Sequence, residues 1–377
     1  MTSATQVADL FTGEFGAPPD GVWSAPGRVN LIGEHTDYTG GLAMPFAINQ
    51  RAWIAARPRT DGIVRAVAHG RGAASASLHE VSRGRPADWL GYLAGAAWVV
   101  EGANGGGWDL ALASDVPIGG GLSSSASITC AALLAMDDLS SSGHGRQELA
   151  GLAQRVEHEV IGIPCGIMDQ TASLRCTRDH LLALDTRTLD VVQVPWRADG
   201  LALLVTDTRA PHVLADGQYA DRRRQCEEAT VTLGIPQLRD ATLAMIEEAG
   251  PLLTADQAAC VRHVVSENGR VIAARTLLEQ GRTDEIGPLL TASHASLRDD
   301  FRVTVPQLDV AAEAALDAGA LGARMTGGGF GGSTLTLVRG EDLDAVRTAI
   351  DTAFADHGFG APAHFVTSPA AGAQRNA

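Results

Sequence analysis

The residues best suited to chemistry include a run of glycine and serine in the first half of the chain. Residues 115–127 read DVPIGGGLSSSAS and lie between a strand-like segment and a long apolar segment that predicts a helix. Glycines let the backbone approach a phosphate closely, and the free amides at a helix start favour an anion. The serine hydroxyls suit phosphate oxygens or Mg²⁺. The run lacks the GK[ST] ending of a Walker loop, and a flexible turn with a serine cap is the alternative interpretation.

A second stretch gathers side chains that can bind hydroxyl groups. Residues 25–38 read APGRVNLIGEHTDY and contain Arg28, Glu34, His35 and Asp37. A sugar presents a ring of hydroxyls that both donate and accept, and carboxylates together with an imidazole can bind neighbouring hydroxyls in pairs. The pattern therefore suits a monosaccharide. Surface ion pairs and helix caps are the alternative.

The third stretch, residues 162–170, reads GIPCGIMDQ and sets one acid, Asp169, inside an apolar loop shaped by glycine and proline. A carboxylate is costly to bury there unless it is paired or used. A helix cap is the other interpretation, and the sequence alone favours it. Glu157, upstream on a predicted helix, is either a metal ligand or a solvated helix residue, and the sequence alone favours the solvated residue.

Strand and helix signals surround these stretches and must position them. Alternating and β-branched apolar residues predict strands at 22–32, 42–57, 108–113, 181–185, 191–196, 201–207 and 333–338. Helices are predicted to begin within 123–127, to cover 147–161 with its acids on polar positions, to dominate from about residue 215, and to cover 341–356. A glycine turn, MTGGGFGG at 325–332, precedes the last predicted strand.

The composition predicts a globular protein with two domains and a ligand site between them. A chain of 377 residues exceeds what one hydrophobic core usually organises, and we place the boundary near Pro195, giving domains 1–195 and 196–377. The formal charge of −15 opposes nucleic acid binding. The one compact basic run, Arg222 to Arg224, is followed by acids and predicts local ion pairs on a helix.

The cysteine spacing and the apolar segments indicate in which cellular compartment the protein is expected. Five cysteines at wide spacings, without a CxxC pair, predict reduced thiols. The start of the chain lacks the basic and apolar regions of a signal peptide, and no run of about 18 apolar residues occurs. We therefore expect a cytoplasmic protein without a membrane partner.

Taken together, the stretches resemble the GHMP small-molecule kinases across nearly the whole chain. GRVNLIGEHTDY is similar to the signature of the galactokinase branch, GLSSSAS to the family's phosphate motif, GIMDQ to its catalytic segment and MTGGGFGG to its C-terminal glycine motif. These motifs occur in the family's order, and chance is a poor explanation for that.

The resemblance implies roles for individual residues. Asp169 would be the catalytic carboxylate and Arg28 its charged partner at the transferring phosphoryl group. Ser125 and Glu157 would hold the Mg²⁺ that accompanies ATP. Trp89 would stack near adenine, or it is a buried tryptophan without a ligand role. The galactose hydroxyls would contact Glu34, His35, Asp37, Gly166 and Tyr219, and the ATP phosphates would contact Gly119, Gly120, Gly121, Leu122, Ser123, Ser124 and Ser125.

The resemblance also implies a two-domain α+β fold. It has an N-terminal α/β domain with an unusual left-handed βαβ crossover and a C-terminal α+β, ferredoxin-like domain, with the active site between them. The implied reaction transfers the γ-phosphoryl group of ATP to the C1 hydroxyl of α-D-galactose, giving galactose 1-phosphate and ADP. Galactose and ATP are then the partners, and we expect a monomer. The alternatives are a kinase for another sugar, such as N-acetylgalactosamine or arabinose, and a sensor that binds galactose and ATP without catalysis.

Overall fold

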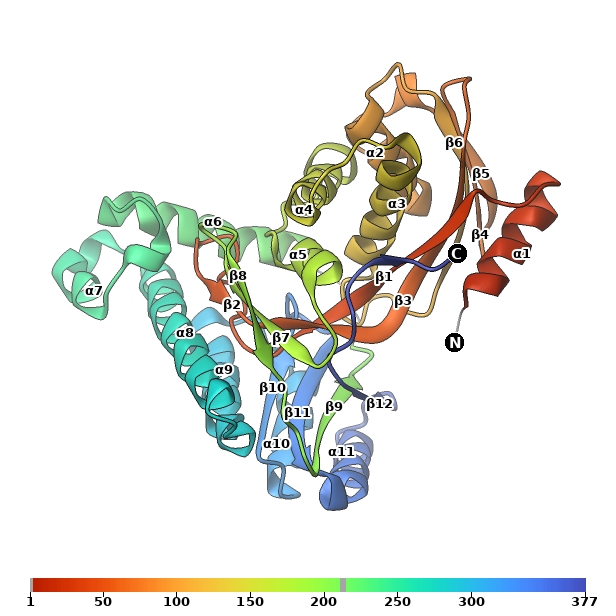
Figure 1. Cartoon of the computed structure of the whole chain (residues 1–377). Coiled ribbons are helices and arrows are strands. Elements are labelled where there is room, and N and C mark those ends of the chain that lie inside the picture. Colours follow the sequence, from red (N-terminus) through yellow and green to blue (C-terminus); the bar gives the residue numbers. More distant parts are fainter. Residues whose placement is uncertain (1–2, 211–214) are drawn as a thin grey trace.

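The computed structural model describes residues 3–210 and 215–377. In these described residues the chain forms three β-sheets, with helices packed around them (Figure 1). In the described part of the chain, no helix is long and apolar enough to cross a membrane.

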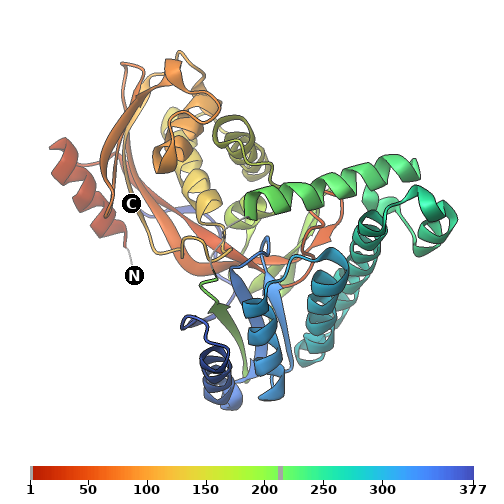
Figure 2. The same cartoon turned by 180° about the vertical axis from the view of Figure 1, so that it is seen from behind.

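The first sheet forms the N-terminal part and has helices on both faces. Its order is β13-β1-β3-β6-β4-β5, antiparallel except where β4 pairs with β6. The strands are β1 (Gly21–Asn30), β3 (Pro45–Pro58), β4 (Ile63–Ala68), β5 (Gly72–Ser77), β6 (Gly107–Ser114) and β13 (Gln374–Arg375). Helix α1 (Ala4–Phe15) lies on the face opposite to α2 and α3, as both views show (Figure 2).

Alternation along the strands explains how this sheet fills both faces. Trp23 and Ile54 face the larger core beneath the helices, whereas their chain neighbours Val22 and Ala55 face α1. This period of two is what a strand covered on both sides requires. The larger core is closed by α2 (Asp88–Glu101), α3 (Ser124–Ser140), α4 (Arg146–Arg155) and α5 (Met168–Arg175).

A small sheet connects the two halves of the chain. Its order is β2-β7-β8, formed by β2 (Leu42–Ala43), β7 (His180–Asp185) and β8 (Val191–Pro195). A shared core next to it contains Leu31 and Phe46 from the first half together with Leu203, Val271 and Leu335 from the second. The two halves are therefore joined by apolar packing and not only by the chain.

The C-terminal sheet has the strand order of a ferredoxin-like fold, as the sequence analysis predicts. The order is β10-β11-β9-β12, and every pairing is antiparallel. The strands are β9 (Leu201–Asp207), β10 (Gly322–Thr326), β11 (Ser333–Arg339) and β12 (Ala363–Thr367), covered by α10 (Pro306–Asp317) and α11 (Leu343–Asp356). Between β9 and α10 the chain forms α6 (Ala215–Leu233), α7 (Leu243–Ala249), α8 (Ala255–Glu279) and α9 (Gly287–Ser296). The mixed α+β character is confirmed, while the handedness of the crossover stays a prediction.

The end of the chain returns to the N-terminal sheet. Strand β13 pairs with β1, so that Trp23 lies opposite Arg375. The Arg51 guanidinium donates to the carbonyls of Ala371 and Gly372 at 2.8 and 2.7 Å. A boundary near Pro195 stays a prediction, and residues 374–375 add a strand to the sheet of the other half.

Close backbone packing between α9 and β10 leads to a stability prediction. A Cβ added at Gly287 would lie 2.0 Å from the carbonyl oxygen of Leu321. We expect Gly287→Ala to lower the free energy of unfolding by about 1–3 kcal/mol, because the backbones must separate. The matched control is Gly269→Ala at an exposed position of α8, where an added Cβ meets nothing within 4 Å. That variant should gain about 0.5–1 kcal/mol. Equal denaturation midpoints for the two variants would contradict the prediction.

Candidate active site

An arginine–carboxylate pair lies at the centre of the site. Arg28, near the end of β1, donates from Nε and Nη2 to the two carboxylate oxygens of Asp169 at 2.7 and 2.9 Å. Its Nη1 donates to the carbonyl of Gly121 at 2.6 Å. Burial opposes the charge of Arg28, but the carboxylates of Asp169 and Glu34 outweigh it and raise the arginine pKa. This two-pronged pair is rigid and planar.

The glycine–serine loop meets this pair at the start of a helix. Helix α3 begins at Ser124, as the sequence analysis predicts, and Ser123 precedes it in a left-handed conformation with φ of 60°. The Ser123 hydroxyl donates to Asp169. The first turn of α3 therefore points its amides and its positive dipole end toward the space beside the pair.

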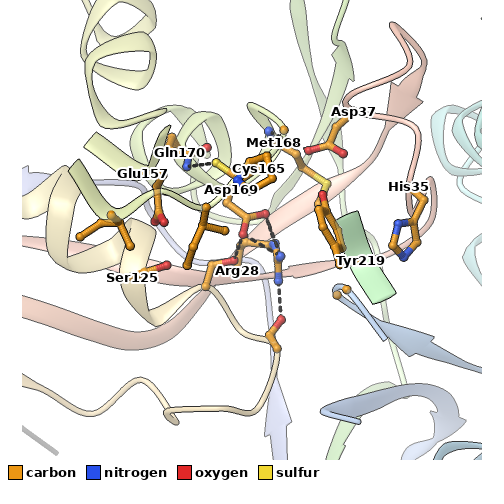
Figure 3. Close-up of a pocket in the computed structure, with 18 of the residues that line it drawn as sticks. Arg28, His35, Asp37, Ser125, Glu157, Cys165, Met168, Asp169, Gln170 and Tyr219 are labelled. Carbon is orange, nitrogen blue, oxygen red and sulfur yellow. Dashed lines mark hydrogen bonds and ion pairs between the residues drawn. The ribbon is translucent and has the colours of Figure 1, made fainter. Parts of the chain in front are cut away.

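Glu157 is buried, contrary to the interpretation that the sequence alone favours. The residue is 4% exposed. Residues Val156–Ile161 form a π-helical turn after α4, and this wider turn breaks the helical period on which the polar position was predicted. Desolvation raises the pKa of Glu157 to about 7, although a hydrogen bond with Ser125 acts in the opposite direction. Figure 3 shows Ser125 and Glu157 together on one side of Arg28.

Asp37, His35 and Tyr219 lie on the other side of the pair (Figure 3). Asp37 accepts from the Met168 amide at 3.4 Å. Desolvation and the nearby Asp169 raise the pKa of Asp37 to about 7. A Cβ on Gly166 would lie 1.7 Å from the Asp37 carboxylate, so only glycine leaves room there.

His35 is enclosed by aromatic rings and is kept neutral. Its ring centroid lies 5.6 Å from that of Tyr219 and 4.7 Å from that of Phe301. Its Nδ1 lies 2.9 Å from the Tyr38 hydroxyl. Burial lowers the pKa of His35 to about 3, so one ring nitrogen donates and the other accepts at neutral pH.

Glu34 connects the site to the C-terminal glycine turn. One of its oxygens accepts from the Gly327 amide at 2.7 Å and from the Thr326 hydroxyl at 3.2 Å. Both partners belong to the MTGGGFGG stretch, for which the sequence predicted a turn but no role. The signal that could have indicated a role for this stretch was its similarity to the C-terminal glycine motif of the family.

These groups line one cavity of about 650 Å³. Of the predicted site residues it contains Arg28, Glu34, His35, Asp37, Gly121, Ser123, Ser125, Glu157, Gly166, Asp169 and Tyr219. Lining residues that the sequence analysis did not single out include Ile161 at the end of the π-helical turn, Cys165 in the loop before α5, Gln170 in α5, and Gly328.

The other predicted residues lie outside this cavity. Trp89, Ser124 and Ser125 line a second cavity of about 310 Å³, so Ser125 belongs to both. Leu122 packs its side chain into the shared core, and its carbonyl accepts from the Arg28 amide at 3.1 Å. The Gly120 carbonyl accepts from the Ser333 hydroxyl. Gly119 lines neither cavity.

Family models match three parts of the chain. Residues 9–58 match the galactokinase galactose-binding signature, 91–176 the N-terminal domain of GHMP kinases and 274–356 their C-terminal domain. A solved mevalonate kinase shares the fold at a TM-score of 0.66 and 17% identity, covering 92% of this chain and 98% of that one. The fold is thus that of the GHMP kinases.

Closer relatives narrow the assignment. The galactokinase of Streptomyces coelicolor is 46% identical over 99% of this chain and 98% of its own. Human galactokinase is 40% identical over 88% of this chain and 89% of its own. The crystal structure of Lactococcus lactis galactokinase complexed with galactose has a TM-score of 0.93 and 32% identity, covering 99% of this chain and all of that one. The chain belongs to the galactokinase family.

The two carboxylates with a raised pKa predict a pH dependence of stability. Asp37 and Glu157 hold a proton up to about pH 7 in the folded protein, whereas in the unfolded chain they release it near pH 4. Their contribution is full below the unfolded pKa and is lost as pH rises through about 7. Between about pH 6 and pH 8 the loss is about 1.4 kcal/mol for each group.

We therefore expect Asp37→Asn to flatten the fall in unfolding free energy over this pH range by about 1.4 kcal/mol. Denaturation of the ligand-free protein at both pH values measures it. Glu14→Gln, an exposed change on α1, is the control and should keep the wild-type slope. A slope in Asp37→Asn as steep as in the wild type would contradict the prediction.

Proposed function

We propose that this protein phosphorylates galactose, moving the γ-phosphoryl group of ATP to the C1 hydroxyl of α-D-galactose. The observation that carries the proposal is the position of the Arg28–Asp169 pair in one cavity. On one side of it lie a helix start and Ser125 with Glu157, and on the other lie Asp37, His35 and Tyr219. Membership in the galactokinase family supports galactose as the sugar.

The sugar is proposed to bind at the side with two acids and an imidazole. Glu34, with one oxygen tied to Gly327, keeps its other oxygen for a sugar hydroxyl. The neutral His35 and the Asp37 carboxyl offer both donors and acceptors, which suits a ring of hydroxyls. Gly166 leaves the room that Asp37 needs, and Tyr219 supplies an apolar face.

The nucleotide is proposed to bind at the start of α3. The loop from Gly119 to Ser125 would surround the phosphates, with contacts from backbone amides and from the serine hydroxyls. Trp89 lines the second cavity, which shares Ser125 with the first cavity. The adenine of ATP could therefore lie beside Trp89 in the second cavity while the phosphates lie in the first.

A magnesium ion fits the residues at this end. Mg²⁺ in kinases is held by one or two protein groups and otherwise by substrate phosphates and water. Ser125 and Glu157 form such a pair, and the raised pKa of Glu157 indicates a buried carboxyl that a cation would stabilise in its charged form. In the described part of the chain, no cluster of three acid, histidine or cysteine ligands occurs, so phosphate oxygens are needed to complete the site. When bound, the ion neutralises charge on the phosphates.

Arg28 and Asp169 are proposed to act at the reacting atoms. Phosphoryl transfer has a loose transition state with charge spread over the equatorial oxygens, so positioning and a positive field do most of the catalysis. Arg28 supplies that field and fixes both oxygens of Asp169. Asp169 accepts the proton of the C1 hydroxyl, as a base or as an orienting acceptor. We further propose a cytoplasmic monomer.

A substrate panel tests the function. ADP formation is measured with galactose, glucose, talose, N-acetylgalactosamine and arabinose side by side, at saturating ATP and Mg²⁺. The proposal expects galactose to give the highest kcat/KM. Preference for an N-acetylated sugar or a pentose would replace galactose, and sugar binding without ADP formation would indicate a sensor.

Replacing the central carboxylate separates binding from turnover. Asp169→Asn should keep galactose binding and lose about 10²-fold or more in kcat, the scale expected for removing acid–base help. Isothermal titration and ADP release measure the two effects. Asp356→Asn, exposed on α11, is the matched control. Near-normal turnover in Asp169→Asn would rule out Asp169 as the proton acceptor.

The Arg28→Lys variant keeps the charge and removes the planar fork. Lysine is a point charge and cannot make both contacts to Asp169 while also reaching the Gly121 carbonyl. We expect kcat/KM to fall by about 10-fold or more. If the Arg28→Lys enzyme were as active as the wild type, positive charge alone would meet the requirement at this position.

A further inference from the structure

The turn that carries Glu34 is held from behind by helix α8. The buried carboxylate of Glu267 accepts from the Gly33 amide at 2.9 Å and from the Glu34 amide at 3.4 Å, both through Oε1. The same oxygen accepts from the Ser293 hydroxyl at 2.7 Å. Oε2 accepts from Arg270 Nε at 2.7 Å.

Two more buried side chains hold the carbonyls of the same turn. His263, one turn before Glu267 on α8, has Nε2 at 3.1 Å from the Glu34 carbonyl. Arg324 on β10 donates from Nη1 to the carbonyls of Asn30 and Leu31 at 3.0 and 3.1 Å. The backbone from 30 to 34 is therefore fixed through amides on one side and carbonyls on the other.

The local sequence of the turn requires such support. Gly33 has φ of +97°, and an added Cβ would lie 2.5 Å from the Leu42 carbonyl, so only glycine fits. Glycine loses more conformational freedom on ordering than any other residue. His35, two positions later, is in a left-handed conformation with φ of 58°. Within the segment the Thr36 hydroxyl donates to the Gly33 carbonyl at 2.8 Å, whereas the amides of Gly33 and Glu34 are bound from outside it, by Glu267.

A buried carboxylate such as that of Glu267 is an unusual acceptor for the backbone amides of Gly33 and Glu34. It is fully buried, and a buried carboxylate is costly unless it is paired and hydrogen-bonded. His263, Arg324 and Arg270 outweigh its desolvation and lower its pKa to about 2, so it is charged at neutral pH. Hydrogen bonds to a charged acceptor are roughly twice as strong as neutral ones.

We infer that Glu267 is a positioning residue for galactose binding: without touching the sugar, it holds the Gly33–Glu34 peptide so that Glu34 and His35 face the cavity. The inference rests on the proposed function, because it assigns the sugar to these two side chains. A purely structural role, in which Glu267 only joins α8 to β1, makes a different prediction, since it would affect both substrates or neither.

Two variants separate the effect of the length of the Glu267 side chain from the effect of its charge. Glu267→Asp keeps the charge but is one methylene shorter and loses contact with the Gly33 amide. Glu267→Gln keeps the length and an acceptor oxygen but loses the charge. Glu279→Gln, on the same helix, is the control, because Glu279 is exposed and pairs only with Arg275 among the described contacts. Steady-state kinetics give KM for galactose and for ATP, and galactose-induced thermal shift reports binding without catalysis.

The expected result is selective for the sugar. KM for galactose should rise about tenfold or more in Glu267→Asp and by a few-fold in Glu267→Gln, with KM for ATP within about twofold of wild type. The thermal shift on adding galactose should shrink in the same order. Unchanged galactose KM in both variants, or equal rises for galactose and ATP, would overturn the inference. If Glu267→Asp does not fold, Glu267→Gln alone tests the inference. Its KM for galactose must then rise by a larger factor than its KM for ATP. A wild type without galactose-dependent ADP formation would instead refute the proposed function.

Discussion

The bidentate pair between Arg28 and Asp169 is the constraint on which the site depends. It joins the end of β1 to the start of α5, which is 141 positions away, and Arg28 also reaches the carbonyl of Gly121 in the glycine–serine loop. One rigid side chain thus sets the relative positions of three segments that are distant in sequence. Asp37, His35 and Tyr219 lie on one side of this fixed point, and Ser125 and Glu157 lie on the other.

Much of this arrangement was predictable because its signals are local. The helix start at Ser124, the strands β1, β3 and β9, and the grouping of Glu34, His35 and Asp37 follow from residue types and short spacings. The family resemblance then supplied what spacing could not, namely that the three stretches meet. The ferredoxin-like strand order was likewise predictable only from the resemblance, since no periodicity within a strand specifies its neighbour in the sheet.

What could not be predicted depends on long-range packing or on a local break in periodicity. The π-helical turn moves Glu157 into the interior, and sequence periodicity assumes a regular helix. The Gly327 amide that binds Glu34 lies 293 positions from it, and Glu267 lies 234 positions from Gly33. Glu267 and His263 stand on a long helix with other polar residues, and nothing in their spacing separates buried from solvated ones.

The return of β13 to the first sheet has a consequence for motion. Because the chain passes between the two halves once after β8 and again after β12, each half is tethered to the other at two separate places. Two connections restrict the relative rotation of the halves more than a single connection would. Together with the apolar core that the two halves share, the two connections restrict sliding of the Arg28–Asp169 pair relative to the glycine turn at 325–332.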